Sequence, residues 1–208
     1  MNIRRAFIYG ILVVGITLLF VAFYQSTSKR KARQQEKKPS GWTELTSNER
    51  DRLRSLGFTP TPKPNLETSL RLKTLSGEDT RLAEWNGRWV LINFWATWCM
   101  PCRVEMPSLQ RLHDRLSAQP FSVVGINMDE SPGKIRSFLN EEGVRFPIRI
   151  DPSGKLGEAF RVNTIPETWL LDPHGHPVAG YTGPREWDSS KIVSLIQSLM
   201  GGEIRGST

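Results

Sequence analysis

The chain of 208 residues contains two cysteines, Cys99 and Cys102, in the sequence Trp-Cys-Met-Pro-Cys. They follow an apolar run typical of a buried strand and precede a helical pattern, so we expect Cys99 at the start of a helix. Unpaired N–H groups and the helix dipole at such a position lower the pKa of a thiol and supply the nucleophilic thiolate. Cys102, one turn further on the same face, can attack a mixed disulfide formed by Cys99. The spacing predicts a redox-active dithiol.

Three other uses of such a cysteine pair are a structural zinc site, covalent haem attachment and a structural disulfide. A structural zinc site needs four ligands, and His113, His174 and His176 do not have the spacing of partners for the cysteines. Covalent haem attachment needs a histidine directly after the second cysteine, where Arg103 stands. A purely structural disulfide across so short a loop would constrain the unfolded chain little. We therefore expect no metal at this site.

The elements that position the pair are expected from apolar patterns. The run Val90–Trp95 predicts a strand buried on both faces, and the pattern from Cys102 onward predicts a helix that Pro107 should kink. A capping box at Thr46 and Glu49 predicts a short helix before Gly57. Further strands are expected near 70–72 and at 121–127, 146–150, 168–171 and 178–181, and further helices near 135–142, at 156–160 and at 192–200, the last ending at Gly201. This alternation predicts an α/β sheet with helices on both faces.

The segment Ala6–Tyr24 contains 19 uncharged residues. As a helix it would span about 29 Å, which matches the hydrocarbon core of a bilayer. It is longer than the apolar part of a signal peptide and does not end in a small-x-small cleavage site, so we expect an uncleaved membrane anchor. The expected division of the chain is an anchor at 1–28, a basic and proline-rich linker at 29–65, a domain at 66–202 and a tail at 203–208.

The net charge of +7 belongs to the N-terminal part of the chain. Residues 1–39 contain eight basic residues and one acid, which leaves 20 basic and 20 acidic residues in the remainder. The domain therefore has no basic surface of the kind that binds nucleic acid, and we expect no nucleic-acid partner. Six of the basic residues follow the apolar segment, whereas only Arg4 and Arg5 precede it. The positive-inside rule alone would place the domain in the cytoplasm, although such a cluster can also lie on anionic headgroups.

The sequence WATWCMPCRVEMP after VLINF resembles the active site of the membrane-anchored thioredoxin-like proteins of the TlpA/ResA/DsbE family. The resemblance covers Leu66 to Gly202 and implies a thioredoxin fold, with residues 123–160 similar to the extra strand–helix insert of this family. Asn93 stands where cytosolic thioredoxins carry a buried aspartate. Pro166 in Ile-Pro-Glu-Thr is similar to the DsbE branch, whereas Met100-Pro101 is closer to the TlpA/ResA branch, so the branch stays open.

The resemblance also implies roles for individual residues. Glu105 matches the acid that exchanges protons with the dithiol, although it could merely cap or solvate the helix. Pro166 matches a cis-proline that faces the cysteines and presents the backbone, with Ile165, to a substrate chain. Trp98 and Glu167 are candidate substrate contacts, with packing around the motif and an exposed strand edge as their respective alternatives.

The implied activity is that of a single-pass thiol–disulfide oxidoreductase on the periplasmic side of a bacterial inner membrane, which reduces disulfides in proteins such as apocytochrome c. The chain has no flavin or nicotinamide motif, so we expect no cofactor besides the dithiol, and the family implies a transmembrane thiol electron donor. A copper metallochaperone on the same fold would have three residues between its cysteines and a late histidine, whereas two residues separate the pair here. A thiol peroxidase of the peroxiredoxin type would have threonine in place of Ala96.

Overall fold

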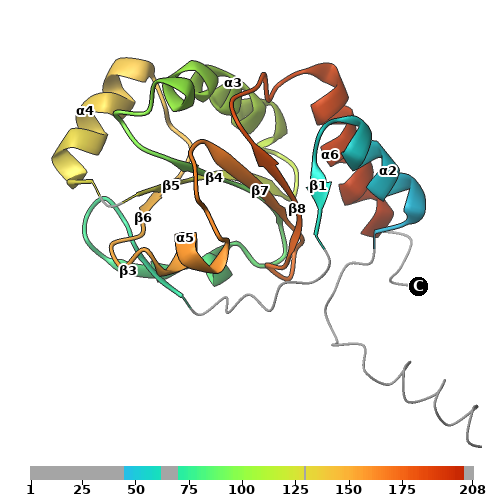
Figure 1. Ribbon diagram of the computed structural model, residues 1–208, viewed down its shortest axis with the longest axis horizontal. Coiled ribbons are helices and arrows are strands. Elements are labelled where there is room, and N and C mark those ends of the chain that lie inside the picture. The colour runs from blue at the N-terminus through green and yellow to red at the C-terminus, as the bar shows by residue number, and fades with distance from the viewer. Residues whose placement is uncertain (1–44, 62–69, 129, 204–208) are drawn as a thin grey trace, which may run out of the picture. The chain divides into compact units, whose positions relative to one another are not determined.

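The computed structural model describes residues 45–61, 70–128 and 130–203 (Figure 1). The expected anchor at Ala6–Tyr24 and most of the expected linker lie outside these residues. Within the described ranges, no helix is both long enough and apolar enough to cross a membrane.

A mixed sheet of eight strands runs through the described part of the chain, in the order β1-β8-β7-β4-β5-β6-β2-β3. The central strand β4 pairs in parallel with β5 and antiparallel with β7. The strands are β1 (Thr59–Pro60), β2 (Arg71–Lys73), β3 (Asp79–Arg81), β4 (Trp89–Trp95), β5 (Phe121–Asn127), β6 (Ile148–Ile150), β7 (Glu167–Leu171) and β8 (Pro177–Thr182).

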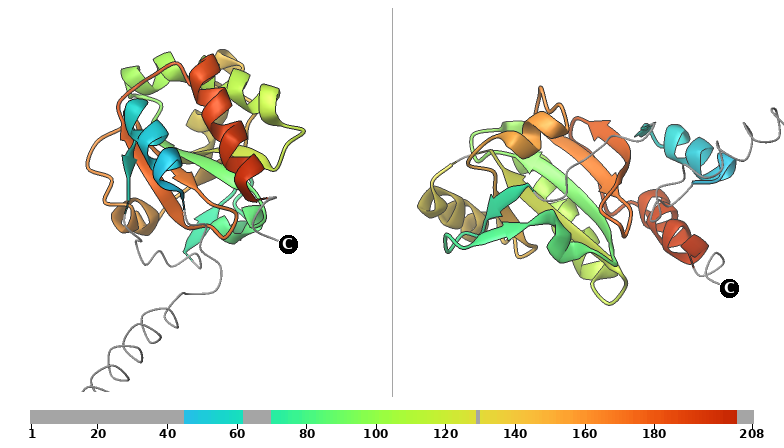
Figure 2. Two further views of the ribbon diagram at one scale, coloured as in Figure 1. Left: turned by 90° about the vertical axis from the view of Figure 1, so that its right-hand side faces the viewer. Right: turned by 90° about the horizontal axis from the view of Figure 1, so that it is seen from below.

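Helices cover both faces of this sheet, as the α/β pattern predicted (Figures 1 and 2). Apolar side chains of α2, α3, α4 and α6 form one core with the sheet, and those of η1 and α5 form a second core on the other face. The helices are α2 (Ser47–Ser55), the 3-10 helix η1 (Leu82–Trp85), α3 (Met100–Leu116), α4 (Pro132–Glu142), α5 (Lys155–Ala159) and α6 (Ser190–Glu203).

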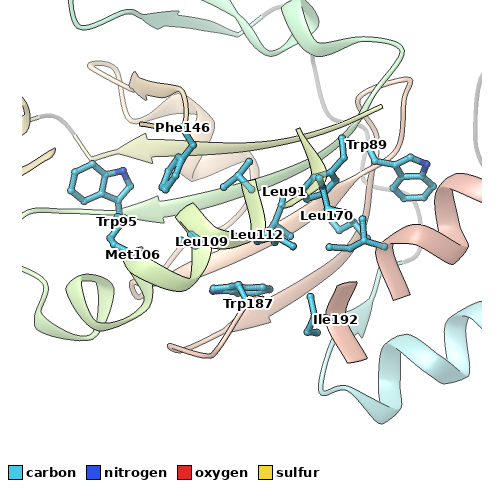
Figure 3. Packing of buried hydrophobic residues seen from close by; sticks show 14 of the residues in the cluster. Trp89, Leu91, Trp95, Met106, Leu109, Leu112, Phe146, Leu170, Trp187 and Ile192 are labelled. Atoms are coloured by element: carbon cyan, nitrogen blue, oxygen red, sulfur yellow. The ribbon is translucent and has the colours of Figure 1, made fainter. Parts of the chain in front are cut away.

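All seven residues of β4 are buried, because alternate side chains of a strand enter opposite cores. Leu91 packs in the core with α3, whereas Ile92 belongs to the core with η1 and α5. Figure 3 shows Leu91 close to Leu112 of α3, on the side of the sheet where Trp89 and Trp95 also lie. A strand held from both sides is a rigid support for the loop that follows it, which carries the cysteines.

The structure differs from the expected elements at three boundaries. Residues 45–61 of the expected linker at 29–65 pack on the domain: the predicted short helix, α2, lies beside α6 (Figure 2), and Thr59 pairs with Gly180 of β8. Proline is compatible with this position because β1 is an edge strand, where a missing N–H costs no sheet hydrogen bond. Helix α6 continues through Gly201, since Leu199 and Met200 are buried in its last turns. Strand β6 begins at Ile148, two residues later than expected.

We expect Gly125→Ala to lower the free energy of unfolding by about 1–3 kcal/mol, as overpacking in cores does. A Cβ at this position in β5 would lie 2.5 Å from Cδ1 of Ile148 and 2.8 Å from Nε1 of Trp95. Denaturant unfolding of the oxidised protein measures the effect. Gly133→Ala is the matched control, because a Cβ there meets no atom within 4 Å. Equal stabilities of the two variants would contradict the tight packing of β5.

Candidate active site

The two cysteines form a disulfide at the start of α3. Cys99 is the N-cap residue, and its Sγ accepts a hydrogen bond from the backbone N–H of Cys102 at 3.2 Å. Pro101 lies in the first turn, where its missing N–H is not needed. A negative charge on the Cys99 sulfur would therefore be stabilised by the N-terminus of the helix, as the sequence predicted.

The two cysteines differ slightly in exposure. Cys102 is completely buried, whereas Cys99 retains 4% of its surface. The exposed large apolar side chains of the described residues are Trp98, Met100 and Val104, which lie next to the two cysteines in the chain. Because isolated apolar groups at a surface are ordinary but a gathered set marks a contact site, this group is a candidate docking surface around Cys99.

A second segment meets the disulfide from the start of β7. The Ile165–Pro166 peptide bond is cis, which confirms the expectation for Pro166. The carbonyl oxygen of Ile165 lies 3.7 Å from Sγ of Cys99. The backbone of this segment thus lies beside the more accessible sulfur.

Glu167 follows the cis-proline but faces away from the network of Glu105. Side chains alternate along β7, so Glu167 and Trp169 share one face, and the Glu167 carboxylate accepts a hydrogen bond from the Trp169 indole at 2.9 Å. Thr168 points to the other face, where its hydroxyl accepts a hydrogen bond from Asn93. Burial raises the pKa of Glu167, and the bond from Trp169 opposes this shift. The predicted substrate contact is therefore a largely buried carboxyl group that is bonded within its own strand.

Glu105 lies inside the protein, with 1% of its surface exposed. Its Oε1 accepts a hydrogen bond from Nδ2 of Asn93 at 2.7 Å, and its Oε2 accepts one from Nε1 of Trp187 at 2.8 Å and one from the backbone N–H of Arg185 at 3.3 Å. Burial raises the pKa of Glu105 to about 7, against the effect of these donors. A carboxyl group one turn after Cys102 is thus close to half protonated at neutral pH, which suits a group that exchanges protons.

Asn93 can serve both protonation states of Glu105. Its Nδ2 donates to Glu105 and to Thr168, and its buried Oδ1 has no hydrogen-bond partner among the described residues. Rotation of the amide by 180° would turn this oxygen toward a protonated Glu105, which is then a donor. An aspartate at this position could not donate to the carboxylate, and its charge would raise the proton affinity of Glu105 further.

A second carboxylate fastens the loop before the cysteines, and the sequence did not reveal it. Glu130 accepts hydrogen bonds from both the backbone N–H and the hydroxyl of Thr97, each at 2.6 Å, and from Asn127 at 2.9 Å. Lys134 forms an ion pair with it at 2.6 Å. Burial disfavours the charge, but these donors outweigh it and lower the pKa of Glu130 to about 2. Glu130 is therefore an anion at all working pH values.

The contacts of Glu105 also include residues that the sequence patterns did not indicate. Trp187 and Arg185 come from the loop after β8, far along the chain from α3. Glu130 had a usable signal, because it follows β5 and the carboxyl ends of the parallel strands β4 and β5 meet at one edge. No local pattern distinguishes Trp187 from the other buried tryptophans.

The comparisons with known proteins agree with this geometry. Residues 64–177 match the model of the AhpC/TSA family. The thiol-disulfide oxidoreductase ResA of Bacillus subtilis is 32% identical over 135 residues, which are 65% of this chain and 74% of that protein. The thioredoxin-like protein YneN of the same organism is 41% identical over 107 residues, 50% of this chain and 62% of that protein.

Solved structures show the same fold. A thiol:disulfide interchange protein of the thioredoxin family from Chlorobium tepidum superposes with a TM-score of 0.55 and 25% identity, over 69% of this chain and 98% of that one. StoA from Bacillus subtilis gives a TM-score of 0.52 and 27% identity, over 60% and 94% of the two chains.

The chain therefore belongs to the AhpC/TSA family and has its thioredoxin-like α/β fold. Within it, the chain is an enzyme of the thiol–disulfide oxidoreductase class, and it is similar to ResA. The family resemblance of the cysteine motif is thus confirmed.

The raised pKa of Glu105 predicts a dependence of stability on pH. The neutral form is favoured in the folded state, so this contribution is fully present below pH 4.5 and is lost as the pH rises through about 7. The loss corresponds to about 3 kcal/mol. Glu105→Gln keeps an uncharged group there, and its stability relative to the native protein should rise by up to that amount between pH 4.5 and 8.5.

Denaturant unfolding of the oxidised protein across this pH range measures the difference. Glu141→Gln is the control, because it removes an exposed carboxylate and should leave the slope with pH unchanged. Parallel stability curves for the native protein and Glu105→Gln would show that Glu105 titrates normally.

Proposed function

We propose that this oxidoreductase reduces disulfides in proteins outside the cytoplasm, with apocytochrome c as the favoured substrate. The observation that carries the proposal is the asymmetry of the site: Cys99, the slightly more exposed of the two cysteines, lies at a helix N-terminus, and the completely buried Cys102 lies one turn before a carboxyl group with a pKa of about 7. One thiol is thus arranged to attack and the other to resolve.

The reaction starts from the dithiol form. The Cys99 thiolate attacks a sulfur of the substrate disulfide, that S–S bond breaks, and the leaving thiolate takes a proton. The carboxylate of Glu105 accepts the proton of Cys102, whose thiolate attacks Sγ of Cys99 and releases the second substrate thiol. Two electrons pass to the substrate, and the Cys99–Cys102 disulfide seen in the structure is the product state. A membrane-bound thiol donor then restores the dithiol.

The surface around Cys99 supports a protein substrate. Trp98 is 70% exposed beside the disulfide, and the Ile165 carbonyl lies next to Sγ of Cys99. An open groove of about 380 Å³ adjoins Trp98 and continues to Phe138 of α4. An extended substrate chain could place its cysteine between Trp98 and Ile165 and a neighbouring side chain in this groove, whose lining also includes Arg103, Lys134 and Glu141.

The proposal includes the location of the enzyme. The uncharged segment Ala6–Tyr24 supports a single membrane anchor, and reduction of apocytochrome c requires the catalytic domain on the extracytoplasmic side. The charge count around that segment points the other way, which makes topology the decisive test of this part.

A trapping experiment tests the assigned order of the cysteines. Cys102→Ser should accumulate a mixed disulfide between Cys99 and an oxidised peptide carrying the Cys-x-x-Cys-His motif, because the resolving thiol is missing. Cys99→Ser should form none, and both variants should lose essentially all insulin reduction. Non-reducing electrophoresis and mass spectrometry detect the adduct. A mixed disulfide on Cys102 instead would reverse the roles.

A redox titration against glutathione tests the direction. A reductant should have an equilibrium potential well below that of the strong oxidants, which lie near −120 mV. A value near −120 mV would mean that the native disulfide is the reactive form and that the enzyme oxidises its substrates.

Labelling in intact cells tests the topology. After reduction, an impermeant thiol reagent should modify Cys99 of the full chain without lysis, and Cys99→Ser should remain unlabelled. Labelling that appears only after lysis would place the domain in the cytoplasm and would exclude extracytoplasmic substrates.

A further inference from the structure

The loop between β8 and α6 lies against the proton-exchanging carboxyl group. Gly183 donates its N–H to the carbonyl of Pro166 at 2.9 Å, which joins the loop to the cis-proline segment. Four residues later, the N–H of Trp187 bonds to Oγ of Ser108 at 3.0 Å, which joins it to α3. Within this segment, the backbone N–H of Arg185 and the indole N–H of Trp187 donate to Oε2 of Glu105.

Trp187 is held in one orientation. Its side chain is fully buried in the core with α3 and α6, and Figure 3 shows it on the side where Leu109, Leu112 and Ile192 pack. Its ring centroid lies 5.7 Å from that of Tyr181 in an edge-on arrangement. Because the ring cannot turn in this packing, its N–H points at Glu105 before any reaction begins.

Arg185 braces the same loop from the other side. Its guanidinium lies 4.3 Å from the ring centroid of Tyr181 and 5.2 Å from that of Trp187. Its Nη1 donates to the carbonyl of Leu56 at the end of α2, at 3.0 Å, and the guanidinium also lies over Phe58. The N-terminal element α2–β1 therefore supports the loop that contacts Glu105.

We propose that Trp187 is a positioning residue of the exchange reaction: its indole N–H holds the Glu105 carboxylate and lowers its proton affinity, so that Glu105 can take the proton of Cys102 near neutral pH. This rests on the proposed role of Glu105 in the proposed function. Asn93 of β4 is a neutral partner, and Arg185 is the cation whose field reaches Glu105. Cys99 and Cys102 at the start of α3 are joined in a disulfide and do not titrate in the oxidised protein.

The direction of the effect follows from the donor. An N–H group that bonds to a carboxylate favours the charged form, and a bond to a charged group is stronger than one between neutral groups. Burial raises the pKa of Glu105, and the hydrogen bond from Trp187 is the contact that lowers it most. Removal of the N–H therefore removes the main effect that opposes burial. The proton-binding constant of Glu105 should then rise about tenfold to a hundredfold, which moves its titration upward by about one to two pH units.

Trp187→Phe tests this, because it keeps an aromatic ring and removes the N–H. The infrared band of the protonated carboxylic acid, identified by its loss in Glu105→Gln, is followed against pH in the oxidised full chain. Its midpoint should lie near pH 7 in the native protein and one to two units higher in Trp187→Phe. The matched control is Trp89→Phe: Trp89 is buried in the same core, and its indole N–H has no hydrogen-bond partner in the described part of the chain. In Trp89→Phe, the midpoint of the infrared titration should remain near pH 7.

A second measurement needs no change at Trp187. In native protein labelled with 15N, the indole N–H resonance of Trp187 should shift with the titration of Glu105, and this shift should vanish in Glu105→Gln. The resonance of Trp89 should be insensitive in both. An insensitive Trp187 resonance would overturn the inference even if Trp187→Phe did not fold.

The pH profile of insulin reduction separates this inference from the proposed function. An upward shift of the profile in Trp187→Phe, equal to the infrared shift, supports both. An infrared shift without any reductase activity of the native protein would overturn the proposed function and leave the influence of Trp187 on Glu105 standing. An unchanged infrared midpoint with reduced thermal stability would show that Trp187 only packs the core.

Discussion

The carboxyl group of Glu105 is withdrawn from water, and the surrounding elements must compensate for that. Moving a carboxylate into the interior is expensive unless donors replace its water molecules. Asn93 of β4 supplies one donor, and the loop after β8 supplies two through Trp187 and the backbone of Arg185. Strand β4, helix α3 and the loop before α6 thus meet at the two carboxylate oxygens of Glu105. The donors offset only part of the effect of burial, so the pKa of Glu105 stays at about 7. At this pKa the carboxyl group can take up or release a proton near neutral pH.

Glu105 and Glu130 show that hydrogen-bond and ion-pair partners, and not burial alone, determine whether a carboxyl group is charged at neutral pH. Glu105 has uncharged donors and is close to half protonated at neutral pH, whereas Glu130 has the ammonium group of Lys134 and both polar hydrogens of Thr97. Its pKa is therefore lowered to about 2. A permanently charged Glu130 can hold the loop before Cys99 in place throughout the redox cycle. The group that is proposed to change its charge and the group that stays charged are thus both glutamates, and their partners set the difference.

The sequence predicted those parts of the site that depend on local patterns. The apolar run of β4, the helix after it and the cysteine spacing are contiguous, so their arrangement follows from strand and helix geometry. The cis form of Pro166 came from the family resemblance and not from the residues alone. The donors to Glu105 were missed because Arg185 and Trp187 are about 80 residues away in the chain and meet it only after the sheet has formed. Strand β1 was missed for the same reason, since its proline signals an extended connector until β8 is beside it.

The segment before residue 64, where the match to the family begins, is connected to Glu105 through a short series of contacts. The carbonyl of Leu56 receives Nη1 of Arg185, the Arg185 side chain stacks on Tyr181 and Trp187, and the loop that they brace donates two hydrogen bonds to Glu105. Burial lowers the pKa of Arg185, and the ring faces and one carbonyl replace part of the hydration of its guanidinium. Arg185 therefore joins α2 to the loop that contacts Glu105 as a half-buried cation. By this route the first described elements of the chain, α2 and β1, and the carboxyl group proposed to exchange the proton are parts of one packed unit.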